Sequence, residues 1–146
     1  DEHLLAPKHV AELVKKGIKV LVQPSTVRTY ADKKYEEAGA IIREDLSEAD
    51  LIVAVKQVPS DLLLPDKTYM FFSHVIKAQP ESMKMLDAIL QKNIRLLDYE
   101  KITDNEGKRL VRFGKFAGYA GMLDTLHALG DRLLALGFST PFLHLG

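Results

Sequence analysis

The spacing of apolar positions predicts strands and helices in alternation along the chain. Short apolar runs predict strands at residues 19–23, 40–42, 51–55, 68–73, 94–97 and 109–111. Amphipathic stretches predict helices at residues 9–16, 32–38, 81–91 and 120–136. The run 51–55 is apolar throughout, which is typical of a parallel strand buried on both faces. This alternation predicts an α/β fold with a mostly parallel sheet and helices on both faces.

The composition is typical of one globular domain and excludes several kinds of site. The chain has 146 residues, and its 20 basic and 20 acidic residues cancel, which gives no support for non-specific nucleic-acid binding. It has no cysteine, so a disulfide framework, a thiolate nucleophile and a Cys-ligated zinc site are excluded. No apolar run approaches the ~20 residues that cross a bilayer, so we predict no membrane partner. The abrupt first and last residues predict a domain of a longer protein.

Titratable side chains follow three of the predicted strands. Lys56 comes directly after the run 51–55, His74 after 68–73, and Asp98 and Glu100 after 94–97. Ligands of open parallel sheets bind beyond the carboxyl ends of the strands, so these groups are candidates for one site. Lys56 and His74 suit proton transfer, which needs a convergent pair. The alternatives are a strand-end lysine with its head in water and a core histidine bonded to backbone.

Other polar residues have more than one interpretation. Arg109 and Arg112 could hold substrate carboxylates, because a guanidinium group matches a carboxylate, or could form surface ion pairs of little energetic effect. His3, His9 and His144 have no metal-ligand spacing, and we predict no metal site.

Three glycines near the last predicted helix do not form a dinucleotide fingerprint. Gly114, Gly118 and Gly121 depart from G-x-G-x-x-G, and no acidic residue follows at the expected distance. We interpret them as positions of close backbone approach in helix packing. The predicted sheet is therefore flavodoxin- or Rossmann-like, without a dinucleotide fingerprint.

Several motifs together resemble one enzyme family. The specific ones are Phe71-Phe72-Ser73-His74 with Lys77-Ala78-Gln79, and Phe113-Gly114 with Ala117-Gly118; weaker ones lie at residues 5–9, 22–25, 55–57, 97–100, 107–109 and 139–142. In this order, over essentially the whole chain, they resemble the N-terminal domain of lysine-ketoglutarate reductase, a part of α-aminoadipic semialdehyde synthase. The chain is more distantly similar to saccharopine dehydrogenases, alanine dehydrogenase and the proton-pumping transhydrogenase.

The resemblance implies an activity in lysine degradation. Residues 1–146 would be the substrate-side domain, and a Rossmann domain outside this chain would bind NADPH. The enzyme would condense L-lysine with 2-oxoglutarate and reduce the imine to saccharopine, so this chain alone would be inactive. The resemblance further implies a fused saccharopine dehydrogenase domain, a homo-oligomer, and the mitochondrial matrix, or the cytosol for a plant-like protein.

The resemblance also assigns roles to residues. It implies that Lys56 and His74 are catalytic, that Glu100, Arg109 and Phe113 lie at the substrate, and that Gln79 lies at the cofactor. One position departs from the family, because Glu2 stands where relatives carry a substrate-binding arginine. Two other readings are a non-catalytic α/β ligand-binding module, which would be free to lose Lys56 and His74, and a relative acting on another amino or keto acid, such as alanine dehydrogenase. The segment 98–100 and the region of Phe142 look closer to the reductase.

Overall fold

The computed structural model describes residues 5–141 and has the predicted α/β organisation. Its α-helices are α1 (Pro7–Lys15), α2 (Asp32–Glu37), α3 (Pro80–Gln91) and α4 (Lys115–Ala135). Its strands are β1 (Leu21–Val22), β2 (Ile41–Ile42), β3 (Leu51–Val53), β4 (Thr68–Phe71) and β5 (Arg95–Asp98), and two 3₁₀-helices are η1 (Val75–Lys77) and η2 (Tyr99–Lys101). All pairings between these strands are parallel. The predicted strand at 109–111 is wrong, because this segment forms only an isolated antiparallel bridge between Thr103 and Arg109.

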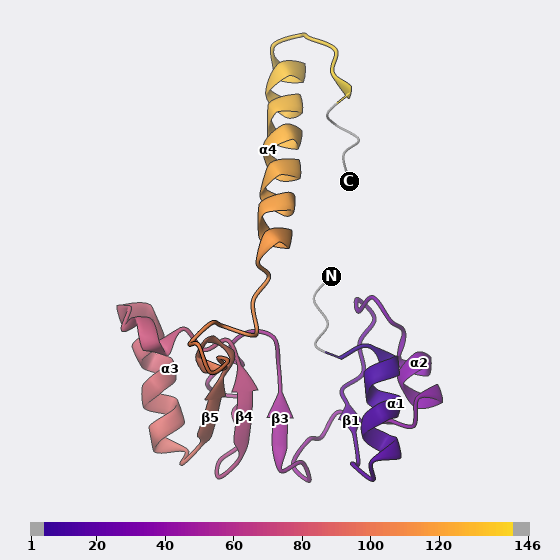
Figure 1. Ribbon diagram of the computed structural model, residues 1–146, viewed down its shortest axis with the longest axis vertical. Helices are drawn as coiled ribbons and strands as arrows, with labels where there is room; N and C mark the ends of the chain where they lie inside the picture. Colours follow the sequence, from indigo (N-terminus) through magenta and orange to yellow (C-terminus); the bar gives the residue numbers. More distant parts are fainter. Residues whose placement is uncertain (1–4, 142–146) are drawn as a thin grey trace.

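The strands form two sheets that lie side by side. β1 pairs with β2, while the second sheet has the order β3–β4–β5. Figure 1 shows β1 next to β3, with the β1–β2 unit on one side and the three-stranded sheet on the other. Between β1 and β3 lies a mainly apolar cavity of about 570 Å³.

Helix α3 covers one face of the three-stranded sheet. Its buried residues Met85 and Ile89 pack with Ile52, Tyr69 and Phe71, all of which are at most 8% exposed. The helix begins with a proline, whose missing N–H is not needed in the first turn, and it is followed by residue 93 in the left-handed conformation. Leu96 of β5 packs against the same cluster, so α3 and the three strands share one core.

The opposite face of this sheet is more open than its sequence indicates. Leu51 and Val53 alternate with the buried Ile52, and they remain 43% and 37% exposed. The prediction that the run 51–55 is buried on both faces is therefore wrong for residues 5–141. An apolar run indicates that burial of the strand is favourable, but it does not predict which element covers each face of the sheet.

A smaller core holds the first sheet. Val10 of α1 and Tyr35 of α2 are buried against Ala40, and the Tyr35 hydroxyl donates a hydrogen bond of 2.8 Å to the carbonyl of Leu5. The Arg28 guanidinium lies 4.6 Å from the centre of the Tyr35 ring. Burial raises the pKa of Tyr35, an effect that Arg28 partly offsets.

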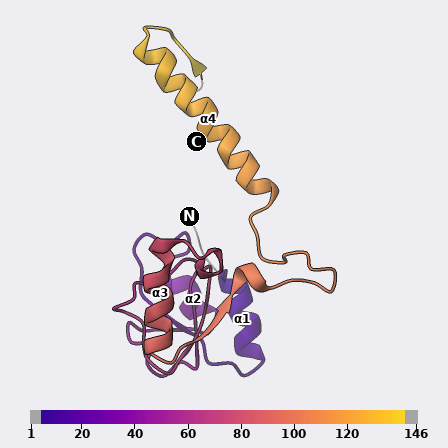
Figure 2. The same ribbon diagram turned by 90° about the vertical axis from the view of Figure 1, so that its left-hand side faces the viewer.

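Helix α4 extends away from the two sheets (Figures 1 and 2). Tyr119, Met122 and Leu129 on this helix are exposed. A Cβ added at Gly118 or Gly121 would meet no atom within 4 Å, so the interpretation of these glycines as close-approach positions is wrong here. Across residues 5–141, none of the helices combines the length and apolar character that a membrane crossing needs.

Candidate functional site

The carboxyl ends of β3, β4 and β5 meet at one edge, as predicted. The ladder between β4 and β5 ends with the pair Phe71–Asp98. Beyond β3, the carbonyl of Val55 accepts a hydrogen bond of 3.1 Å from the N–H of Phe72. These pairings bring the segments that begin at Lys56, Ser73 and Asp98 to the same edge of the sheet.

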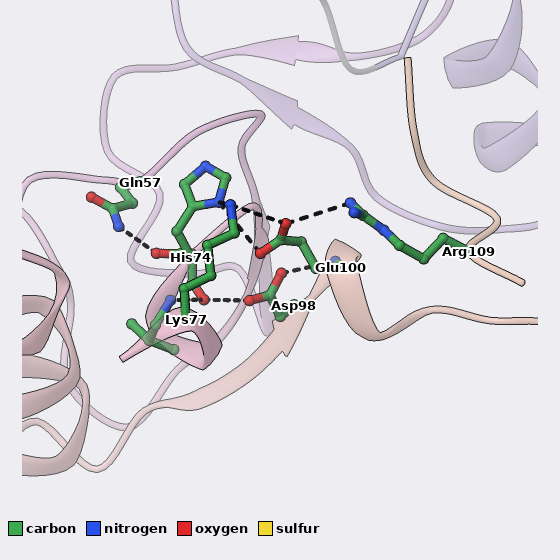
Figure 3. Close-up of polar contacts among 8 residues, drawn as sticks. Gln57, His74, Lys77, Asp98, Glu100 and Arg109 are labelled. Carbon is green, nitrogen blue, oxygen red and sulfur yellow. Dashed lines mark hydrogen bonds and ion pairs between the residues drawn. The ribbon is translucent and has the colours of Figure 1, made fainter. Parts of the chain in front are cut away.

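Glu100 is the centre of a charged cluster at this edge (Figure 3). Its side chain is only 9% exposed, and its carboxylate oxygens lie 3.3 Å from Nδ1 of His74, 3.5 Å from Nζ of Lys77 and 3.6 Å from Nη2 of Arg109. The three partners are each between 43% and 48% exposed. One shielded carboxylate therefore faces three basic groups that water and small molecules can reach.

Nδ1 of His74 has two competing partners. It lies 3.1 Å from Nζ of Lys77 as well as 3.3 Å from the Glu100 carboxylate. An Nδ1 that carries a proton can donate to Glu100, whereas an Nδ1 without a proton can accept from the Lys77 ammonium. The arrangement can therefore accommodate either protonation state of this ring nitrogen.

The local backbone brings Lys77 to His74. His74 has a φ of 58°, in the left-handed region, and it precedes the single turn η1. The N–H of Lys77 donates to the carbonyl of His74 at 3.1 Å, and residues three apart in such a turn face the same side. The ring of Phe72 stacks on the His74 ring, with centroids 6.4 Å apart and planes 14° apart.

A second polar layer lies beneath the charged cluster. The hydroxyl of Ser73 donates to Oδ2 of Asp98, and the side-chain amide of Gln57 donates to the carbonyl of Ser73 (Figure 3). Oδ1 of Asp98 accepts the N–H of Glu100 at 2.9 Å, which begins η2. Ser73 is completely buried.

Arg109 reaches the cluster through a tight turn. Oδ1 of Asp104 accepts the N–H groups of Glu106 at 3.0 Å and Lys108 at 2.8 Å, and Gly107 supplies a φ of 79°. The bridge between residues 103 and 109 then closes the turn. This turn, rather than a strand, directs Arg109 towards Glu100.

The structure thus brings together three of the predicted site residues, His74, Glu100 and Arg109. Lys56 is exposed at the same edge, on the segment that follows β3. Gln79 is exposed directly before α3, and Phe113 is 57% exposed before α4. Glu2 and Phe142 lie outside the described residues, as do His3 and His144.

Sequence reasoning missed Lys77 as a member of the site. Its spacing of three residues from His74 was the available signal, but that spacing gains meaning only if a turn of helix follows the histidine. For a metal ion the described residues offer no group of three or more His, Cys, Asp or Glu side chains.

The buried Tyr99 packs against Phe72, next to the charged cluster. Tyr99 is 6% exposed, and its ring centre lies 5.0 Å from that of Phe72. Burial raises the pKa of Tyr99, so this phenol stays neutral well above physiological pH. Tyr99 and Phe72 form an apolar base under His74.

The glycines at the start of α4 do not form a pyrophosphate site of the dinucleotide-binding type. Gly114, with a φ of 56°, precedes α4, but it follows the turn at residues 103–109 and not a strand of the parallel sheet. Its surroundings are open, since a Cβ at this position would meet no atom within 4 Å. The start of α4 is thus not the strand–turn–helix unit that binds a phosphate.

Comparison with known proteins assigns the chain to a family. The model of the family described as "Alanine dehydrogenase/PNT, N-terminal domain" matches residues 4–120. The chain is 55% identical over 142 residues to the mitochondrial alpha-aminoadipic semialdehyde synthase of Mus musculus and 48% identical over 148 residues to the alpha-aminoadipic semialdehyde synthase of Arabidopsis thaliana. Each match covers 97% of this chain, but only 15% and 14% of those proteins.

A more distant relative has a single named activity. The chain is 32% identical over 123 residues to a saccharopine dehydrogenase [NAD(+), L-lysine-forming] of Emericella nidulans, a match that covers 80% of this chain and 33% of that protein. The matched family model spans β1 to β5 and the whole charged cluster around Glu100. With its parallel α/β core and this match over most of its length, the chain belongs to the alanine dehydrogenase/PNT N-terminal domain family.

Proposed function

We propose that residues 1–146 are the substrate-side domain of a saccharopine-forming reductase of lysine degradation. The full-length protein would condense L-lysine with 2-oxoglutarate and reduce the resulting imine with NADPH. The observation that carries this proposal is the cluster of His74, Lys77 and Arg109 around the shielded Glu100, in a chain 55% identical over 97% of its length to an alpha-aminoadipic semialdehyde synthase.

The chemistry needs groups that move protons at the edge of the sheet. Imine formation passes through a carbinolamine, so the amine must lose protons and the keto oxygen must gain them before it leaves as water. We assign these transfers to Lys56 and His74, which share the carboxyl edge of the sheet. Proton transfer by a positioned side chain contributes roughly 10²- to 10⁴-fold to a rate.

Glu100 and Lys77 would keep His74 ready in both protonation states. When the ring holds a proton on Nδ1, the Glu100 carboxylate at 3.3 Å accepts it in a hydrogen bond. When that nitrogen is free, the Lys77 ammonium at 3.1 Å donates to it. The other ring nitrogen is then the one that faces the reactants, because Nδ1 is occupied in either state.

Arg109 and Phe113 would bind the substrates. The contact of Arg109 with Glu100 uses Nη2 at 3.6 Å, which leaves further N–H groups of a partly exposed guanidinium for a substrate carboxylate. Phe113 is exposed four residues later, and its ring suits the aliphatic chain of a lysine. Since the two follow each other on one segment, they would recognise the charged and apolar parts of one ligand.

The cofactor would be held mainly by a domain outside this chain. The departure of Gly114, Gly118 and Gly121 from a dinucleotide fingerprint, and the open surroundings of these glycines, support this division. Gln79, exposed before α3, would be the contact from this side. When bound, NADPH supplies the hydride that reduces the imine. The 146-residue chain alone is therefore expected to show no reductase activity.

The setting of the full-length protein follows from its relatives. The Mus musculus relative is named mitochondrial, and we propose the mitochondrial matrix for this protein too, which subcellular fractionation tests. The chain spans 15% of that relative, so we also propose fused Rossmann and saccharopine dehydrogenase domains. Native mass spectrometry of the full-length protein tests the proposed homo-oligomer.

The decisive experiment follows NADPH oxidation by the full-length protein with L-lysine and 2-oxoglutarate together, and with each omitted. Turnover that needs both substrates is expected. Lys56→Met and His74→Ala are each expected to lower kcat by at least about 100-fold. Lys84→Met on α3 and His127→Ala on α4 are matched controls, because both residues are exposed and lie outside the cluster.

Other results would redirect or end the proposal. NADH used in place of NADPH measures cofactor preference, and a clear preference for NADH would contradict the NADP assignment. Turnover of a different keto acid with ammonia would move the protein to an alanine dehydrogenase-like activity. No turnover by a folded full-length protein would favour a non-catalytic ligand-binding module.

A further inference from the structure

Ser73 is an unusual residue for its position, because it is polar and completely buried beside the charged cluster. Its hydroxyl donates to Oδ2 of Asp98 and accepts the N–H of Val75 at 3.3 Å. Its carbonyl accepts a hydrogen bond from the side chain of Gln57. With no exposed surface, Ser73 cannot touch a substrate, so any role in the reaction must act through its neighbours.

Ser73 and Asp98 adjoin His74 and Glu100, the two residues whose side chains face each other in the cluster. Ser73 immediately precedes His74, and Asp98 holds the N–H of Glu100 through Oδ1 at 2.9 Å. The β4–β5 ladder ends at the pair Phe71–Asp98, so neither His74 nor Glu100 belongs to it. The hydrogen bond between Ser73 and Asp98 continues the connection between the two strands beyond the end of the ladder (Figure 3).

The backbone at His74 needs such a connection. A φ of 58° is disfavoured for a residue that has a Cβ, and it persists where the surroundings determine it. The bonds that Ser73 makes to Asp98, to Val75 and to Gln57 fix the residue immediately before His74 on both its side chain and its backbone.

We infer that Ser73 and Asp98 are positioning residues that keep His74 within reach of Glu100 and oriented for proton transfer. This inference rests on the proposed function for its kinetic consequence but not for its structural one. Loss of either side chain removes the hydrogen bond between them, and Asp98 additionally holds the N–H of Glu100. Asp98→Ala should therefore have the larger effect, and adding Ser73→Ala to it should change little.

The kinetic test is a double-mutant cycle in the full-length protein. Ser73→Ala and Asp98→Ala are each expected to lower kcat about 10- to 100-fold, with KM values changed less than about threefold, since a displacement of about 1 Å can have an effect of that size. The double variant is expected to be no slower than the slower single variant. Ser82→Ala and Asp87→Ala on α3, a buried serine and an exposed aspartate, should match the wild type. Ser73→Thr, which restores the hydroxyl, should recover most of kcat.

The structural test does not depend on turnover. Long-range ¹H–¹⁵N spectra of the 146-residue chain, with ¹⁵N-labelled histidine, report which ring nitrogen of His74 carries the proton. The His74 signals are expected to change in Ser73→Ala, while those of His9 and His127 stay in place. If the full-length wild type shows no turnover with L-lysine and 2-oxoglutarate together, the proposed function fails. The spectra would still decide whether Ser73 positions His74.

Two results would overturn the inference. One is multiplicative losses of kcat in the double variant, because independent effects would mean that the two residues do not act as a pair. The other is wild-type kcat together with unchanged His74 signals in Ser73→Ala. If that variant fails to fold, Asp98→Leu, which is similar in shape to Asp98 but offers no acceptor to the Ser73 hydroxyl, takes its place under the same criteria.

Discussion

The charge on Glu100 should be the most sensitive feature of the candidate site. Glu100→Gln keeps the shape of the side chain but removes the charge that faces His74, Lys77 and Arg109 at 3.3, 3.5 and 3.6 Å. Near 4 Å, one ion pair amounts to about 1 kcal/mol in water and about 4 kcal/mol at the effective dielectric constant of a protein surface. Partners that are almost half exposed lie close to the lower value, at about 1–2 kcal/mol for each pair.

The three contributions do not simply add, because His74 is charged only when it is protonated and because the partly exposed Lys77 and Arg109 can turn to water once the carboxylate is gone. We therefore expect a net loss of about 2 kcal/mol of transition-state stabilisation, which corresponds to about a 30-fold decrease in kcat/KM. Initial rates of NADPH oxidation by the full-length protein measure this, with Glu12→Gln on the surface of α1 as the control. A kcat/KM within twofold of the wild type would refute the reasoning that this carboxylate organises the cluster.

Three further predictions concern stability, measured by urea unfolding of the 146-residue chain. Lys92→Met should lower the free energy of unfolding by about 1.5–3 kcal/mol, because Nζ of Lys92 donates to the carbonyls of Ser60 at 2.8 Å and Leu63 at 2.6 Å; an unchanged midpoint would contradict this. Ile89→Ala should cost about 2–5 kcal/mol and the adjacent Leu90→Ala far less, since these residues are 4% and 70% exposed; equal losses would exclude the described face of α3. Burial raises the pKa of Tyr35, so the stabilising effect of the neutral phenol is complete below the unfolded pKa of ~10 and is lost as the pH rises through the folded pKa. The Tyr35→Phe variant should therefore lose less stability above pH ~10 than the wild type. Parallel pH profiles of the two proteins would disprove this prediction.

The sequence was sufficient for features that depend on local pattern. Helix α3 was predicted as 81–91 and runs from Pro80 to Gln91, because its apolar spacing and its first residues are both local signals. The apolar runs predicted strand ends at residues 55, 73 and 97, and the strands end at 53, 71 and 98. The shared edge that carries Lys56, His74 and Glu100 was therefore predictable to within two residues. The general rule that ligands bind at this edge identified the candidate region before any contact was known.

Local pattern failed where a neighbour decides the outcome. Leu51 and Val53 are as apolar as Ile52, yet they are exposed because α3 covers only one face of the sheet. Gly118 and Gly121 pack against nothing within 4 Å, because α4 extends away from the sheets. Apolar character and small size make burial and close packing possible at a position, but the surrounding elements determine whether either occurs.

By itself, the sequence determined the α/β class, most of the helices and strands, and the edge at which His74 and Glu100 emerge. Only the tertiary structure decided that Lys77 turns back to Nδ1 of His74, that Arg109 returns to Glu100 through a turn, and that a buried bond joins Ser73 to Asp98. The physical reason is range. Helix and strand formation depends on residues a few positions apart, whereas a charged cluster depends on distances of 3–4 Å between side chains on separate segments, which exist only once the backbone has folded.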